Sequence, residues 1–357
     1  MRESDDNLFC RRPTAPDRQA SSLIGNCAMN DFTSARLPED AAPGLIRSAD
    51  SYPVLDAETQ SFVDHAAEAG VPAERLREWA NGDATDAIHA EEIALTAGAA
   101  DPGFTIRIVR PPQAAPTPLP AVLFLPDGAS FAGGQSDNRL ARRIATDAEA
   151  AVVLVDYTSA PAACFQTQNE QAFAALVHLQ EHARALNLDG GALIVAGEGT
   201  GGHLVATLAL LVKARRGPRI ALQIMLCPTL SASTAGASAA RYAGGPSLTT
   251  QTTGMRARTR FPSDTLGETI AMPLNASYTD LEDLPPALIV TAENDVARDD
   301  GEAYARKLML AGVRVSAVRC LGTIHDFTVL DGLADTPPTE AALRLACGTI
   351  RATLRGH

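Results

Sequence analysis

The sequence has 357 residues, of which 46% are hydrophobic, enough for one large domain or two ordinary ones. Its formal net charge of −12 repels phosphate backbones and anionic lipid surfaces, and no apolar run reaches the length of a membrane span. We therefore expect a soluble, cytoplasmic protein that binds neither nucleic acid nor membranes. The six cysteines are far apart and form no C-x-x-C pair, so neither a zinc site nor a disulfide framework is predicted.

The N-terminal part of the chain differs from the rest. Residues 1–50 are polar and lack a sustained hydrophobic period, so we expect them to be disordered and to precede one domain over residues 51–357. Residues 55–70 and 72–81 have apolar residues at helical spacing, which predicts two short amphipathic helices. Much later, residues 229–283 interrupt the pattern of the domain. We expect residues 51–85 and 229–283 to form its cap.

From residue 90 onward, short β-rich runs alternate with helical patterns, which is typical of a mostly parallel sheet with helices on both faces. The runs at 90–95 and 103–111 alternate apolar and polar residues and predict an antiparallel pair at a sheet edge. The other runs are apolar throughout and predict central strands: 121–126, 151–157, 192–197, 220–228, 286–295 and 313–319. Helices are expected at 136–149, 168–187, 200–215, 299–312 and 337–355. The fold class is therefore α/β, with an eight-stranded sheet and a helical cap.

The segment GEGTG, residues 197–201, joins a buried strand to a helix. This is the setting of a nucleophile elbow, whose usual form is G-x-S-x-G. Glycines at positions 197 and 201 are expected because strand and helix approach too closely for side chains. The middle position is Gly199, which supplies no hydroxyl. Glycine-rich corners also cradle phosphates in dinucleotide-binding folds, but no G-x-G-x-x-G occurs near the first strand.

Five segments, in order, resemble the hormone-sensitive-lipase or bacterial acetyl-esterase family of α/β-hydrolases. Residues 119–134 resemble a strand followed by H-G-G-G, residues 155–166 resemble V-D-Y-R-L-A-P-E, and residues 197–202 resemble G-D-S-A-G-G. Residues 284–308 and 322–327 resemble the segments that carry the family's acid, at Asp295, and its histidine, at His325. The resemblance implies an α/β-hydrolase fold and a relation to carboxylic-ester hydrolases. It also implies a homodimer through the last strand and helix.

The chain departs from this family at the chemistry. Gly199 replaces the nucleophilic serine, so no acyl-enzyme can form there. The H-G-G-G loop is degenerate, and the residues aligned with it are Pro126, Asp127, Gly128 and Ala129. Backbone N–H groups of this loop and of Thr200 could still form an oxyanion hole, but the Asp127 carboxylate would oppose an oxyanion.

The groups that remain are Asp295 and His325, which would form a His–Asp dyad. Such a dyad activates water or removes a proton in an elimination or cyclisation. We therefore expect a small-molecule enzyme that acts on a carbonyl or ester-like substrate without a serine nucleophile, so ordinary serine-esterase activity is disfavoured. The alternatives are a ligand-binding pseudoenzyme and a decayed esterase.

The surroundings of the dyad can also be predicted. Ser130 and Glu198 are further candidates for the pocket, whereas the Thr200 side chain is expected to point away from it. We expect the His325 imidazole to open to a pocket that contains Asp127, and we expect Asp127 and Asp295 to raise its pKa. Such a pocket would prefer proton donors or cations. No metal and no cofactor are predicted.

Overall fold

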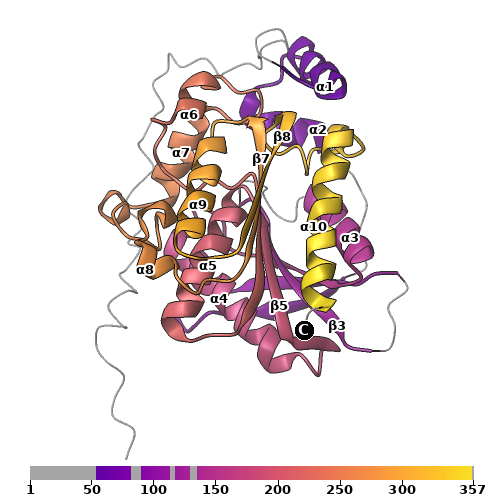
Figure 1. Ribbon diagram of the computed structural model, residues 1–357, viewed down its shortest axis with the longest axis vertical. Helices are drawn as coiled ribbons and strands as arrows, with labels where there is room; N and C mark the ends of the chain where they lie inside the picture. The colour runs from indigo at the N-terminus through magenta and orange to yellow at the C-terminus, as the bar shows by residue number, and fades with distance from the viewer. Residues whose placement is uncertain (1–53, 82–89, 113–116, 129–134, 356–357) are drawn as a thin grey trace, which may run out of the picture. The chain divides into compact units, whose positions relative to one another are not determined.

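The computed structural model describes residues 54–81, 90–112, 117–128 and 135–355, so the disorder expected for residues 1–50 concerns a segment outside the described part. An eight-stranded sheet runs through this part in the order β1-β2-β4-β3-β5-β6-β7-β8 (Figure 1). The strands are β1 (Glu91–Leu95), β2 (Phe104–Val109), β3 (Leu119–Leu125), β4 (Ala151–Asp156), β5 (Leu188–Glu198), β6 (Ile220–Leu226), β7 (Ala287–Asn294) and β8 (Val315–Ile324). Strand β2 pairs antiparallel with β1 and β4, and the other pairs are parallel. The mostly parallel sheet with an antiparallel pair at one edge is therefore confirmed.

Helices cover both faces of the sheet, as predicted. Helices α3 and α10 lie on one side of it in Figure 1, and α4, α5 and α9 lie on the other. The α-helices are α1 (Ala57–Glu68), α2 (Leu76–Asn81), α3 (Gln135–Ala148), α4 (Phe165–His182), α5 (Thr200–Arg215), α6 (Ala237–Arg241), α7 (Thr250–Arg260), α8 (Tyr278–Leu281), α9 (Arg298–Leu310) and α10 (Pro337–Arg355). Within the described ranges, none of these helices has both the length and the apolar character of a membrane span.

The apolar runs form strands because both faces of the sheet are buried. In β3, Val122 and Phe124 pack in the core that contains the α3 and α10 side chains. The alternate residues Leu123 and Leu125 pack in the core that contains those of α4, α5 and α9. A strand with helices on both sides needs apolar side chains at every position, which explains the continuous run.

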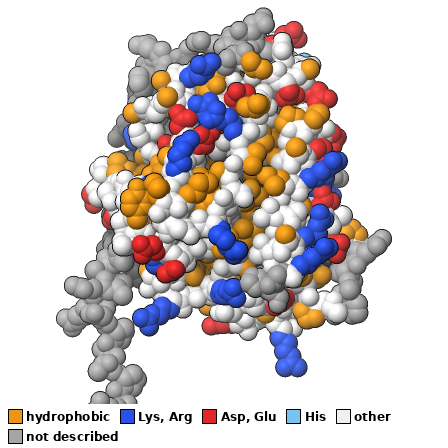
Figure 2. All heavy atoms as spheres, viewed as in Figure 1, with side chains coloured by type: hydrophobic (Ala, Val, Ile, Leu, Met, Phe, Trp, Pro, Cys, Tyr) orange, Lys and Arg blue, Asp and Glu red, His pale blue; other side chains and the backbone are white. Residues whose placement is uncertain are grey.

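Strand β8 was predicted to be central, and this prediction is wrong. It lies at the edge of the sheet and pairs only with β7 among the described strands. Val318 and Leu321 are 39% and 67% exposed, and Figure 2 shows hydrophobic side chains along the middle of the face where Figure 1 draws β7 and β8. An edge strand with apolar exposed positions has the same sequence pattern as a buried one. The homodimer expected through this strand stays a prediction.

The topology brings the polar residues of the sequence motifs to one edge of the sheet. Parallel strands end at the same edge, where α/β proteins bind their ligands. Asp127 lies two residues after β3, Gly199 follows β5, Asp295 follows β7 and His325 follows β8. Segments separated by up to 200 residues therefore meet in one place.

Candidate active site

The corner between β5 and α5 is built from glycines because the surrounding backbone segments almost touch. A Cβ at Gly197 would lie 2.4 Å from the carbonyl oxygen of Gly201, and one at Gly201 would lie 1.7 Å from that of Leu125. The prediction that close approach requires these two glycines is confirmed. Between them, Gly199 has φ 54° and ψ −116°, a backbone conformation that strongly favours glycine. Position 199, at the turn of the corner, therefore presents no side chain.

The carboxylate of Asp127 covers the front of this corner. Asp127 is 1% exposed, and its Oδ1 accepts a hydrogen bond from the backbone N–H of Thr200 with an N···O distance of 3.2 Å. A Cβ at Gly199 would lie 3.1 Å from Cγ of Asp127. The carboxyl group thus stands where a side chain at position 199 would project. The Thr200 N–H was expected to be an open oxyanion donor, but Asp127 occupies it.

Two arginines from distant segments offset the charge of Asp127. Arg256 of α7 places Nη1 3.3 Å from Oδ2 of Asp127, and Arg77 of α2 places Nη1 3.8 Å from the same oxygen. Burial raises the pKa of Asp127, but Arg256 and Arg77 outweigh it and hold the pKa below its ordinary value. Asp127 is therefore ionised, and the expected preference for cationic ligands is weakened by two positive charges that the sequence did not reveal.

Glu198, the last residue of β5, is buried beside this group. Arg77 donates from Nη1 to Oε2 of Glu198 at 3.0 Å. Burial raises the pKa of Glu198 well above its usual range, the charge of Asp326 raises it further, and Arg77 only partly opposes this. The surroundings therefore shift these two carboxyl groups in opposite directions, with the pKa of Glu198 raised and that of Asp127 lowered.

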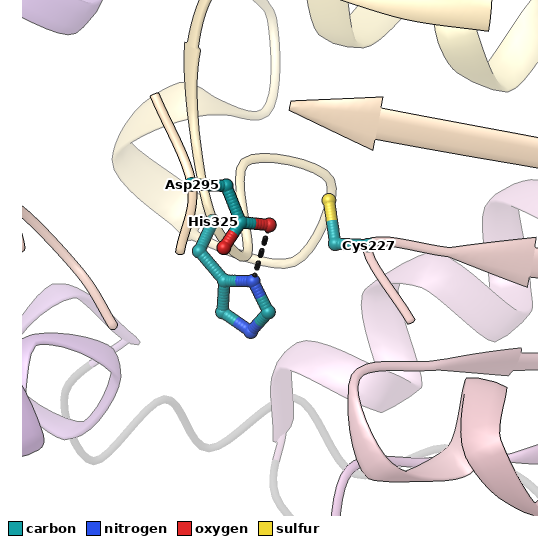
Figure 3. Close-up of side chains that lie close together, drawn as sticks. All are labelled: Cys227, Asp295 and His325. Atoms are coloured by element: carbon teal, nitrogen blue, oxygen red, sulfur yellow. Dashed lines mark hydrogen bonds and ion pairs between the residues drawn. The ribbon is translucent and has the colours of Figure 1, made fainter. Parts of the chain in front are cut away.

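His325 and Asp295 meet at the ends of two neighbouring strands. The distance between Nδ1 of His325 and Oδ2 of Asp295 is 2.8 Å (Figure 3). The other oxygen of Asp295 accepts a hydrogen bond from the N–H of Ala297 at 2.8 Å, which fixes the carboxylate. The two side chains thus form the hydrogen-bonded pair that their positions in the sequence suggested. The expected opening of the imidazole to a pocket is wrong, because His325 is only 1% exposed.

The second ring nitrogen of His325 faces Asp326. Oδ1 of Asp326 lies 3.2 Å from Nε2, and Asp326 has a φ of 66°, which is uncommon outside glycine. Burial by itself lowers the pKa of His325, but the charges of Asp295, Asp326 and Asp127 outweigh it and raise the pKa to about 9. The expected rise is confirmed. At neutral pH the ring is an imidazolium held between two carboxylates.

Comparison with known proteins shows where this arrangement belongs. A family model described as the alpha/beta hydrolase fold matches residues 128–329. The chain belongs to the α/β-hydrolase fold family. It is 36% identical to an ethyl acetate hydrolase of Pseudomonas putida over 229 residues, which cover 62% of this chain and 70% of that protein. It is 33% identical to the carboxylesterase NlhH of Mycobacterium tuberculosis over 225 residues, covering 62% and 70%.

Solved structures agree with this assignment. The crystal structure of a thermostable esterase from Pseudomonas putida ECU1011 superposes on this α/β-hydrolase with a TM-score of 0.78 and 33% sequence identity. The superposition covers 85% of this chain and 98% of the esterase. The α/β-hydrolase fold and an esterase-like family are therefore established for the chain.

Cys227, just after β6, is a further polar side chain beside the dyad of this α/β-hydrolase (Figure 3). Its sulfur and ligand atoms of Asp295 and His325 lie within 4.8 Å of one another, as do ligand atoms of Glu198, His325 and Asp326. Both groups contain atom types that bind metal ions. However, burial and the charge of Asp295 raise the pKa of the Cys227 thiol well above its usual range. A protonated thiol is neither a good ligand nor a nucleophile.

The remaining predicted residues have different outcomes. Gly128 lies against Tyr157, because a Cβ there would be 2.9 Å from the Tyr157 hydroxyl, which itself donates to the Pro126 carbonyl at 2.6 Å. Ala129 and Ser130 lie outside the described residues.

Sequence reasoning missed four side chains of the site: Arg77, Arg256, Asp326 and Cys227. Only Asp326 had a usable signal, because it directly follows the predicted histidine. The two arginines lie in helices of the expected cap, where a charged residue normally faces solvent.

Proposed function

We propose that this protein is an enzyme that acts on a small carbonyl or ester-like molecule by proton transfer through His325 and Asp295. The observation that carries the proposal is their 2.8 Å hydrogen bond at the carboxyl edge of the sheet, beside a corner that has no nucleophile. A histidine oriented in this way by a carboxylate can exchange protons with a substrate without a covalent intermediate.

We infer that Gly199 occupies the position at which esterases of this family carry their serine. Its place between β5 and α5 and its φ of 54° support this. The corner has the sharp strand-to-helix turn of a nucleophile elbow, although residue 199 has no side chain for the turn to present. We also infer that residues 126–129 are a changed H-G-G-G loop. A substrate oxyanion would have to compete with Asp127 for the Thr200 N–H, which disfavours the tetrahedral intermediate of ester hydrolysis.

The protonation states suggest how the site works. Environments that push two pKa values apart mark an acid and a base. The raised pKa of His325, about 9, makes it a proton donor at neutral pH, and the lowered pKa of Asp127 leaves that group a carboxylate. In the proposed reaction His325 protonates a carbonyl or leaving group, and a carboxylate or an activated water accepts the proton that the substrate loses.

Hydrogen exchange tests this proposal without knowledge of the net reaction. The protein is incubated in D₂O with pyruvate, acetoacetate or ethyl acetoacetate, and deuterium at the carbon next to the carbonyl is followed by NMR. We expect catalysed exchange with at least one of these probes and its loss in His325→Gln and Asp295→Asn. Exchange that is the same in both variants as in the wild type would remove these residues from the mechanism.

A specific observation favours a second candidate, a ligand-binding pseudoenzyme or a decayed esterase. Nε2 of His325 faces Asp326 rather than an open cavity, and both side chains are buried. Under this alternative, ligands bind but no probe is exchanged or converted, and His325→Gln leaves ligand binding unchanged.

A further inference from the structure

Arg260, the last residue of α7, is a buried cation. Its side chain is 6% exposed, and the guanidinium lies 4.8 Å from the ring centroid of Phe261. Nε donates to Oε1 of Gln168 at 2.7 Å, and Nη2 donates to Nδ1 of His203 at 3.2 Å. Among the residues that the structure describes, no carboxylate pairs with it. Buried arginine without a counter-ion is rare because desolvation of the charge is costly.

Neither hydrogen-bond partner of Arg260 can supply the missing negative charge. Gln168 is a neutral amide whose Nε2 donates to the Thr158 carbonyl at 3.2 Å. His203 Nε2 bonds the Ala271 carbonyl at 2.7 Å, so Nδ1 is the acceptor. Burial and the charge of Arg260 lower the pKa of His203 well below its usual range, which keeps the ring neutral. Burial lowers the pKa of Arg260 to about 10, so its charge persists at neutral pH.

The other cations of the site each contact a carboxylate directly, whereas Arg260 contacts none among the described residues. Each of the other cations contacts a carboxylate, and these cations are Arg77, Arg256 and His325. The charge of Asp127 acts on Arg260 from a distance and partly opposes the effect of burial on its pKa. Among the described residues, however, no carboxylate forms an ion pair with the guanidinium of Arg260, which distinguishes it from the other three cations.

We propose that Arg260 binds an oxyanion, a carboxylate or a phosphate group, of the molecule that this site takes. A guanidinium has five N–H groups, and only two of them are used within the described part of the chain. Nη1 of Arg260 bonds neither of these partners, yet it is not one of the buried polar atoms that lack a partner, so this nitrogen keeps some exposure. Planar N–H pairs of arginine match carboxylate and phosphate oxygens in a bidentate contact.

The position of Arg260 limits the size of the ligand. Arg256, which contacts Asp127, lies four residues earlier on α7, so the two arginines are on one side of the helix about 6 Å apart along its axis. The anionic group would bind about one helical turn from Asp127. We therefore infer a short acid whose reacting carbon and anionic group are a few bonds apart. This deepens the proposed function and rests on it only for the claim that the ligand reacts.

Binding is tested with propionate, its neutral analogue propionamide, and methyl phosphate, by titration calorimetry at constant ionic strength. The variants are Arg260→Gln and a matched control, Arg258→Gln, which removes an exposed arginine from the same helix. We expect wild type and Arg258→Gln to bind propionate or methyl phosphate, and to bind the anion about tenfold or more tightly than propionamide. Arg260→Gln should lose this preference. Whichever anion binds more tightly identifies the group.

A third variant, Arg260→Lys, keeps the charge but loses the planar N–H pairs, and should bind the anion with intermediate affinity. It also decides the case if Arg260→Gln does not fold. Equal binding of propionate and propionamide by the wild type, or unchanged anion binding in Arg260→Gln or Arg260→Lys, would overturn the inference. If the wild type bound the anion as expected but catalysed no deuterium exchange, this result would instead count against the proposed function alone.

Discussion

Gly199→Ser, by itself, should fail to give this protein efficient esterase activity, although it creates the sequence G-x-S-x-G. The added Cβ would lie 3.1 Å from Cγ of Asp127, so the new hydroxyl must displace the carboxylate or adopt a strained rotamer. The Thr200 N–H that should bind the oxyanion also remains bonded to Asp127. Asp127→Gly removes both obstacles. We therefore expect the double variant Asp127→Gly/Gly199→Ser to be the active one.

The size of the difference follows from the charge. An oxyanion that shares the Thr200 N–H with the Asp127 carboxylate would lie about 4 Å from it, where two like charges repel by about 4 kcal/mol at an effective dielectric constant of about 20. This corresponds to a rate factor of about 10³. The loss of one oxyanion donor costs a similar factor of about 10² to 10³. The double variant should thus exceed Gly199→Ser by about 10³ in kcat/KM, less the screening by Arg77 and Arg256.

The assay is hydrolysis of p-nitrophenyl acetate, combined with mass spectrometry after a serine-directed phosphonate to count reactive serines. The wild type should be nearly inactive and unlabelled. Asp127→Asn/Gly199→Ser removes the charge but keeps the bulk, and should be intermediate. Adding His325→Gln to the double variant should abolish the activity. If Gly199→Ser alone equalled the double variant, Asp127 would not obstruct the site and the interpretation of its position would fail.

Three other predictions concern stability and reactivity. The folded pKa of His325, about 9, exceeds the unfolded value of 6.5. Its contribution of up to about 3 kcal/mol to the free energy of unfolding is therefore complete below pH 6.5 and is lost as pH rises through 9. Urea titrations should show this loss in the wild type and a flatter pH profile in His325→Gln. Gly201→Ala places its Cβ 1.7 Å from the Leu125 oxygen and should lower the free energy of unfolding by more than about 4 kcal/mol or prevent folding. Gly348→Ala, whose Cβ meets no atom within 4 Å, should instead stabilise α10 by up to about 1 kcal/mol in the same assay. Iodoacetamide should not modify Cys227 in the native protein and should modify it readily in urea, because the pKa of the buried thiol is raised; rapid native labelling at this residue would contradict the described burial.

The fold could be predicted from the sequence because its signals are local. Strand β5, the glycine corner and helix α5 follow one another in the chain, and the apolar runs reveal which strands have helices on both faces. The order of the strands in the sheet depends on which strands pair with one another, and a local pattern does not show this. For β8 the run at 313–319 gave no indication that one neighbour is missing within the described sheet. A local sequence pattern indicates whether side chains are buried, but an edge strand with exposed apolar residues has the same pattern as a buried strand.

The dyad was predictable and its surroundings were not, for a physical reason. Asp295 and His325 each follow a strand in the parallel sheet, so their meeting depends only on topology. The contact between Arg256 and Asp127 joins residues 129 positions apart through a helix outside the sheet. Nothing in the periodicity of α7 indicates that this arginine turns inward. The contact of Asp326 with Nε2 of His325 was likewise not readable from the sequence, because Asp326 adopts an uncommon φ of 66° there.

The cluster around Asp127 argues against simple decay. Buried ion pairs are weak contributors to stability, and well-packed apolar side chains in their place often stabilise a protein by about 1 to 4 kcal/mol. With glycine at position 199, an apolar residue at position 127 would therefore fill this corner at a lower cost in stability than a buried carboxylate does. Instead Asp127, Arg77 and Arg256 are interdependent, since Gly199 makes room for the carboxylate and the arginines keep it ionised. Such an arrangement lowers stability, yet its side chains hold one another in a single geometry. This combination is expected of a site that still binds a charged or protonated ligand group. Arg260 extends the same reasoning to the proposed ligand, because among the described residues no carboxylate forms an ion pair with its buried guanidinium.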